Sequence, residues 1–161
     1  MSLERGIAPD PFDILPAKPS FTLVSDDIAD GVPLDQARVH DSAGGKNVSP
    51  GLRWSGFPAE TKSFVVTIYD PDAPTQSGFW HWVVVNLPVS VTELATGAGE
   101  SDATLPAGAI HLRNDMGLNA YAGAAPPQGD RVHRYVTTVH AVDVEKLDVG
   151  SATPPAIAGF N

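Results

Sequence analysis

Residues 63–87, SFVVTIYDPDAPTQSGFWHWVVVNL, decide the fold because two apolar segments flank a polar, proline-rich loop. Ser63–Tyr69 is rich in β-branched and aromatic residues, which predicts a strand that stops at Asp70. Trp80–Leu87 is an almost continuous apolar run, typical of a strand buried on both faces. The loop between them, Asp70–Pro74, carries two carboxylates beside prolines that stiffen its backbone.

The rest of the chain extends this β-rich pattern. Fifteen Pro and fifteen Gly are spread over 161 residues, which favours many short elements joined by turns. Further strands are predicted at Ser20–Val24 and Val132–Val144, whereas helix signals are weak. We therefore expect an all-β fold, an antiparallel two-sheet β-sandwich with a few short helices. Residues 1–19 predict an extended N-terminal arm, and residues 20–161 a single domain.

Composition excludes several classes of function. The net charge of −9 disfavours nucleic acid and anionic membrane surfaces as partners, because both require clustered basic residues. The chain has no cysteine, which excludes disulfides, a thiolate nucleophile and thiolate metal sites. No apolar run approaches the ~18 residues of a membrane span, and the N-terminus has no signal-like apolar region. We expect a cytoplasmic protein without integral membrane association.

The candidate functional side chains lie near the predicted strand ends. Alternation along Trp80–Leu87 predicts that His81 lies on the opposite face from Trp80 and Trp82. The acidic loop, with Asp70 and Asp72, comes immediately before this strand in the chain.

A second histidine segment, GDRVHRY at residues 129–135, supplies the remaining candidates. Alternation places His133 and Tyr135 on one face and Arg134 on the other. Two histidines, two aspartates and a tyrosine are suitable groups for a small polar pocket.

Three chemistries suit such a pocket. Protonated imidazoles can donate to a phosphate or carboxylate, neutral imidazoles with carboxylates can ligate a divalent metal such as zinc, and a His–Asp pair can act as general acid and base. The sequence contains no Gly-x-Ser-x-Gly, His-Glu-x-x-His, Walker A or Gly-x-Gly-x-x-Gly motif, so serine hydrolases, zinc proteases and nucleotide enzymes gain no support.

The motifs together resemble the phosphatidylethanolamine-binding protein family, with a spacing most similar to its bacterial Raf-kinase-inhibitor-like branch. The resemblance runs from Phe21 to Asn161. The segments that carry it are Ser49–Trp54, Pro58–Ser63, Asp70–Pro74, Trp80–Asn86, Ala125–Pro127 with Gly129, and Val132–Tyr135.

This resemblance implies a two-sheet β-sandwich with a small anion-binding pocket at one end. Members of the family bind phosphate-bearing head groups such as phosphoethanolamine, some regulate kinases or serine proteases, and bacterial relatives often form homodimers. No cofactor and no metal is implied. The residues carried over to the pocket are Asp70, Asp72, His81, His133 and Tyr135, with Pro74, Pro126 and Pro127 shaping its walls.

Two departures from the family pattern bear on the pocket. Residues 123–127 read Gly-Ala-Ala-Pro-Pro where the branch commonly has Gly-Pro-Cys-Pro-Pro. The family usually continues past a Gly-Phe-Asn such as 159–161 with a helix, so we expect that C-terminal helix to be absent here.

We therefore predict non-enzymatic binding of a small phosphate-bearing or other anionic ligand, with His81 and His133 as protonated donors. Asp70 or Asp72 would orient and charge an imidazole. One alternative is a protein–protein regulator that inhibits a kinase or serine protease. The other is an enzyme, a metal-assisted or His/Asp hydrolase, which near-stoichiometric zinc would support.

Overall fold

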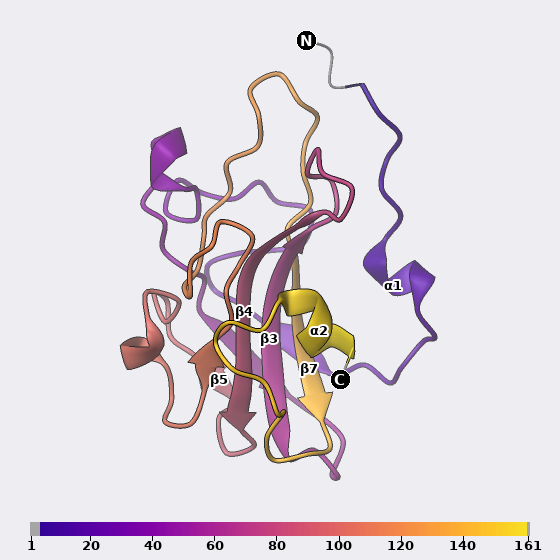
Figure 1. Ribbon diagram of the computed structural model, residues 1–161, viewed down its shortest axis with the longest axis vertical. Coiled ribbons are helices and arrows are strands. Elements are labelled where there is room, and N and C mark those ends of the chain that lie inside the picture. Colours follow the sequence, from indigo (N-terminus) through magenta and orange to yellow (C-terminus); the bar gives the residue numbers. More distant parts are fainter. Residues whose placement is uncertain (1–3, 161) are drawn as a thin grey trace.

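Two antiparallel sheets and a few short helices form the fold, as the sequence predicts (Figure 1). The computed structural model describes residues 4–160. One sheet has the strand order β1-β2-β5, and the other has the order β6-β4-β3-β7. The strands are β1 (Thr22–Val24), β2 (Leu52–Ser55), β3 (Ser63–Asp70), β4 (Phe79–Pro88), β5 (Glu93–Leu94), β6 (Ile110–His111) and β7 (Val136–Val142). The helices are α1 (Pro11–Ile14), η1 (Asp41–Ala43), η2 (Asp102–Thr104) and α2 (Pro155–Phe160).

The central strands β3 and β4 are buried on both faces. On one face Phe64 of β3 and Trp82 of β4 pack in a cluster with Trp54 of β2. On the other face, Val83 packs in a second cluster with Ala158 of α2. Double burial explains why both strands are almost continuously apolar.

A β-bulge at His81 changes the predicted alternation. Ile68 pairs with Trp82 and Tyr69 pairs with Trp80, so His81 is the extra residue on β4. A bulge re-aims side chains because two residues of one strand oppose one residue of its partner. His81 consequently lines the same cavity as Ile68, which belongs to the Trp82 cluster. The prediction that His81 points away from Trp82 is therefore wrong.

The strand predicted at Val132–Val144 is shorter in the structure, where β7 spans Val136–Val142. The residues before it direct their hydrogen bonds elsewhere: the Arg134 backbone N–H donates to Asp72 Oδ2 at 3.0 Å. A backbone donor used by a side chain is lost to the sheet ladder. The segment 130–135 therefore acts as a loop that presents its side chains to the β3–β4 loop.

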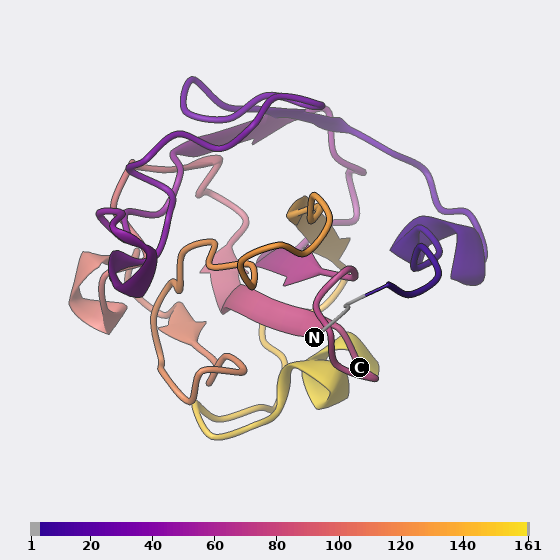
Figure 2. The same cartoon turned by 90° about the horizontal axis from the view of Figure 1, so that it is seen from above.

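The N-terminal arm contains α1 but is otherwise without regular structure from residue 4 to residue 19. Asp10 caps α1 by accepting from the Phe12 N–H at 2.9 Å, and Pro11 occupies the first turn. In Figures 1 and 2 the arm runs along one side of the sandwich, close to the β3–β4 loop. Residues 1–3 of the predicted arm and Asn161 lie outside the described range. The expectation that the family's C-terminal helix is absent after Asn161 also concerns positions outside that range.

Candidate functional site

The two carboxylates of the β3–β4 loop have different partners. Asp70, the last residue of β3, accepts the Asp72 N–H through Oδ1 at 2.7 Å. Asp72 accepts from Arg134 in bidentate geometry, from Nε at 2.7 Å and from Nη2 at 2.9 Å. Both aspartates are buried. The Arg134 hydrogen bond lowers the pKa of Asp72, while burial acts in the opposite direction.

His133 bridges two carboxylates. Its Nδ1 lies 2.7 Å from Asp70 Oδ2, and its Nε2 lies 3.0 Å from Asp130 Oδ2. The three side chains are almost fully buried. Because a carboxylate only accepts, two such hydrogen bonds require an imidazolium with both ring nitrogens donating. His133 therefore has no ring donor left for a ligand, unlike the direct donor that the sequence suggested.

An arginine from the N-terminal arm completes this network. Arg5 Nη1 donates to Asp130 Oδ1 at 2.8 Å, and Arg5 Nη2 donates to the Asp72 carbonyl. The pKa of Asp130 is lowered, first by the Arg5 hydrogen bond and also by the one from His133. Asp70, His133 and Asp130 thus form a continuous buried chain whose charges are compensated within the protein.

His81 lies in a contrasting environment. Its Nδ1 lies 2.8 Å from the Ala122 carbonyl and must carry the proton, because a carbonyl only accepts. Burial lowers the pKa of His81, although the Ala122 carbonyl acts in the opposite direction. The ring is therefore neutral near pH 7, with a lone pair on Nε2.

Tyr135 faces His81. The two rings meet edge to face with centroids 5.1 Å apart. The Tyr135 hydroxyl is buried, and among residues 4–160 it has no hydrogen-bond partner. Burial also raises the pKa of the Tyr135 phenol. The phenol therefore stays protonated and can donate a hydrogen bond.

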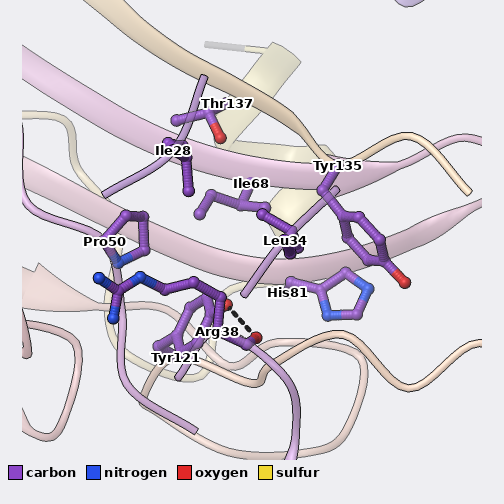
Figure 3. A pocket seen from close by; sticks show the side chains of 9 residues that line it. All are labelled: Ile28, Leu34, Arg38, Pro50, Ile68, His81, Tyr121, Tyr135 and Thr137. Atoms are coloured by element: carbon purple, nitrogen blue, oxygen red, sulfur yellow. Dashed lines mark hydrogen bonds between the residues drawn. The ribbon is translucent and has the colours of Figure 1, made fainter. Parts of the chain in front are cut away.

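A cavity of about 10 Å³ lies beside these two rings, which is room for about one water molecule. Figure 3 shows His81 and Tyr135 together at one end of it, and Arg38 with Pro50 at the other. The lining residues are Ile28, Leu34, Arg38, Pro50, Ile68, His81, Tyr121, Tyr135 and Thr137.

Close backbone packing holds the Ala122 carbonyl in place. A Cβ added to Gly123 would lie 2.5 Å from the His40 nitrogen and 2.6 Å from the Val39 carbonyl carbon. The Tyr121 hydroxyl donates to the Arg38 carbonyl at 2.8 Å. Only glycine at position 123 lets this segment approach residues 38–40 so closely. The close packing holds the Ala122 carbonyl in place, and this carbonyl keeps the proton of His81 on Nδ1.

The structure therefore divides the eight predicted site residues into three sets. Asp70, Asp72 and His133 belong to the charged network, and His81 and Tyr135 line the cavity. Pro74, Pro126 and Pro127 are exposed and do not line this cavity. They also do not line a second cavity, of about 350 Å³, between residues 5–14 and the β3–β4 loop. The expectation that these prolines shape the pocket wall gains no support.

The residues that sequence reasoning missed are Arg5, Ala122, Asp130 and Arg134. Asp130 lies three residues before His133 in the quoted segment, so a search for acidic neighbours would have found it. Arg5 lies 125 residues from Asp130, and no local pattern links them. Within residues 4–160, no group of three or more histidine, aspartate or glutamate side chains is arranged to hold a metal ion.

Comparisons with known proteins agree with this architecture. The phosphatidylethanolamine-binding protein family model matches residues 24–160. YbhB of Escherichia coli K12 is 50% identical over 141 residues, covering 86% of this chain and 89% of YbhB. The crystal structure of E. coli YbcL, described as a member of the mammalian PEBP family, superposes with a TM-score of 0.84 at 48% identity, covering 87% of each chain. A PEBP homologue from Chlamydia trachomatis superposes with a TM-score of 0.70 at 28% identity, covering 87% of this chain and 86% of its own.

Proposed function

Because the chain belongs to the phosphatidylethanolamine-binding protein family, we propose that it binds a small phosphate-bearing or other anionic ligand at His81 and Tyr135. The ligand class is that of a phosphoethanolamine-like head group. One observation carries the proposal: the Tyr135 hydroxyl is buried and has no hydrogen-bond partner within residues 4–160. A buried hydroxyl left without a partner costs about 1–3 kcal/mol, which a ligand oxygen would recover.

Binding at this site is linked to protonation. His81 can donate to an anion through Nε2 only after it gains a proton, and its lowered pKa keeps it neutral in the unliganded protein. A bound anion raises the imidazole pKa, so the complex takes up a proton. Affinity therefore increases as the pH falls through the pKa of the complex, and it levels off below the pKa of the unliganded His81.

The cavity must enlarge to admit a phosphate group. Its present volume of about 10 Å³ holds about one water molecule. Ile28 and Leu34 form part of its wall and are only partly buried, and residues 29–33 between them are exposed. We infer that this segment moves outward when the ligand enters.

The charged network supports binding rather than catalysis. His133 uses both ring nitrogens within the protein, so it holds no lone pair that could accept a proton from water or a serine. We infer that Asp70, Asp72 and His133 brace the two loops around the ligand site. We infer that His133 itself is a structural residue and not a general base.

A titration followed by NMR tests the proposal. Inorganic phosphate, phosphoethanolamine and sulfate are added to ¹⁵N-labelled protein, and the ring signals of His81 and amides 28–38 are followed. Sulfate matters because its charge stays constant from about pH 5 to 8, whereas phosphate itself titrates near 6 to 7. We expect saturable shifts that tighten as the pH falls. Shifts that are absent, or equally strong in Tyr135→Phe, would overturn the assignment.

Regulation of a kinase or serine protease, and homodimer formation, stay predictions from the family resemblance. The compartment also stays a prediction. In residues 4–160 no helix is long and apolar enough to cross a membrane. However, LppC of Mycobacterium tuberculosis, 34% identical over 145 residues, is named a lipoprotein, so family membership does not fix a cytoplasmic location.

A further inference from the structure

Residues 4–15, here called the strap, are tied to both loops of the site by polar contacts. Arg5 donates to the Asp130 carboxylate and to the Asp72 carbonyl. In return, Arg131 donates to the Arg5 carbonyl and Arg134 Nη2 donates to the Ala8 carbonyl at 2.7 Å. Three of the six arginines in an acidic chain therefore meet at one place. The strap joins the β3–β4 loop to the loop before β7.

The strap contributes little apolar packing. No residue of α1 is buried, and the apolar side chains of the strap point largely to solvent. Their exposed fractions are 80% for Ile7, 56% for Phe12, 66% for Ile14 and 69% for Leu15. A cavity of about 350 Å³ also separates residues 5–14 from the β3–β4 loop, so the strap is not close-packed on it. Figure 2 shows this segment standing apart from the sheets.

We propose that the strap is a salt-sensitive latch with a closed and an open state, and that its closure orders the two loops around the ligand site. Burial of apolar surface is the main force that holds segments together in water, and the strap lacks it. The Arg5 side chain is 27% exposed although Asp130 is buried, so mobile ions at high salt screen its charge and weaken its contacts. The closed state therefore depends on the arginine contacts, and chiefly on Arg5.

Opening of the strap would loosen the β3–β4 loop and the loop before β7, because the contact between Arg5 and Asp130 would be lost. This carboxylate faces Arg5 from the strap, the Arg131 N–H from its own loop, and His133. Loss of Arg5 removes the largest influence that lowers the pKa of Asp130. It also removes the link between Asp130 and the Asp72 carbonyl. Both loops then lose a shared cross-link, and Tyr135 lies on the segment that becomes looser.

Distance measurements between two spin labels test the latch. The chain contains no cysteine, so Ile7→Cys on the strap and Lys62→Cys at the exposed residue just before β3 provide two unique sites. We expect one narrow distance distribution at low ionic strength. Arg5→Ala should broaden it towards longer distances. About 1 M salt, where the Debye length is about 3 Å, should broaden it in the otherwise unchanged protein.

Arg53→Ala is the matched control. Arg53 on β2 also forms a two-contact pair with an aspartate, Asp26, which follows β1, and neither residue belongs to the strap. The control should keep the narrow distribution. A narrow distribution in Arg5→Ala, or equal broadening in Arg53→Ala, would overturn the latch. Arg5→Lys, which keeps the charge but not the fork of two donors, should give an intermediate distribution.

Amide relaxation measured by NMR tests the effect on the loops. Residues 71–78 and 128–134 should become more mobile in Arg5→Ala and unchanged in Arg53→Ala, and equal mobility in the two variants would overturn the coupling. The spin-label distances and the amide relaxation are measured without ligand, so they do not depend on the proposed function. Failure of the proposed function would appear separately, as absence of phosphate binding to the unmodified protein.

Discussion

His133 and His81 lie at the same end of the sandwich, yet their surroundings are opposite. His133 has a carboxylate at each ring nitrogen and lies in a network whose charges are matched. His81 has one carbonyl partner at Nδ1, a lowered pKa, and a neighbouring tyrosine hydroxyl without a partner in the described chain. Satisfied polar groups stabilise a fold, and unsatisfied ones are available to a ligand. This difference is the basis of the roles proposed for the two residues, structural support for His133 and ligand recognition for His81.

The largest expected difference between the two regions is in stability. His133→Ala leaves Asp70 buried without its imidazolium, and breaking a buried charged pair in this way costs about 3–5 kcal/mol. Tyr135→Phe removes an unpartnered hydroxyl and should leave stability unchanged or slightly higher. Urea unfolding of the two variants measures both effects. Equal losses of stability in the two variants would contradict the division into a structural charged network and a separate ligand site.

Gly123→Ala should have the next largest effect on stability. Its Cβ would meet the backbone of Val39 and His40 at distances that real structures do not show, and overpacking of this kind costs about 1–3 kcal/mol. The shift would also displace the Ala122 carbonyl from His81. Gly108→Ala is a useful comparison, because its Cβ meets nothing within 4 Å and only its φ of +95° is unfavourable. Unfolding curves should rank Gly123→Ala as the less stable, and the reverse order would count against tight packing at this carbonyl.

Loss of ligand affinity is the third effect. Tyr135→Phe should weaken sulfate binding about tenfold or more, since a hydrogen bond to a charged group is worth about 1.5–3 kcal/mol. His140→Gln, which changes an exposed histidine on β7, should leave the affinity unchanged. Isothermal titration calorimetry at about pH 6 measures both variants. Full affinity in Tyr135→Phe would remove the hydroxyl from the site.

The smallest effect is the pH dependence of stability. Burial lowers the pKa of His81 and of His111, so the unfolded chain binds protons that the folded chain does not. Their contribution is fully present above the ordinary pKa of 6.5 and is lost as the pH falls towards the folded values. The melting temperature should therefore decline below about pH 6.5, before the aspartates with lowered pKa values begin to titrate. Added sulfate should reduce the decline, and a flat profile would contradict neutral buried imidazoles.

The central strands could be predicted because their signal is local. Ser63–Tyr69 and Trp80–Leu87 combine β-propensity with double burial, and both appear as β3 and β4. The position of His81 could not be predicted from alternation, because a bulge depends on pairing between strands. The extent of β7 was overestimated because Asp72, 62 residues away, takes the backbone N–H of Arg134.

The candidate site shows the same limit. Asp70, Asp72, His81, His133 and Tyr135 were identified as polar residues near strand ends, and they do lie at one end of the sandwich. Their division into a charged network and a cavity lining depends on three further residues. Arg5 and Arg134 pair with carboxylates, and Asp130 is the second carboxylate that contacts His133. From the sequence, His81 and His133 were expected to be the positively charged groups of the site, whereas Arg5 and Arg134 also pair with its carboxylates. Ion pairs between distant residues leave no periodic trace in a sequence.

The most direct measurement is a ¹H–¹⁵N correlation of the histidine side chains during a sulfate titration at about pH 6. We expect the His81 ring to change from the neutral pattern, with a lone pair on Nε2, to the doubly protonated pattern as sulfate binds. We expect His133 to show the doubly protonated pattern from the start and not to change. A neutral His133 that responds to sulfate while His81 stays unchanged would contradict the proposed roles of the two residues and reverse them.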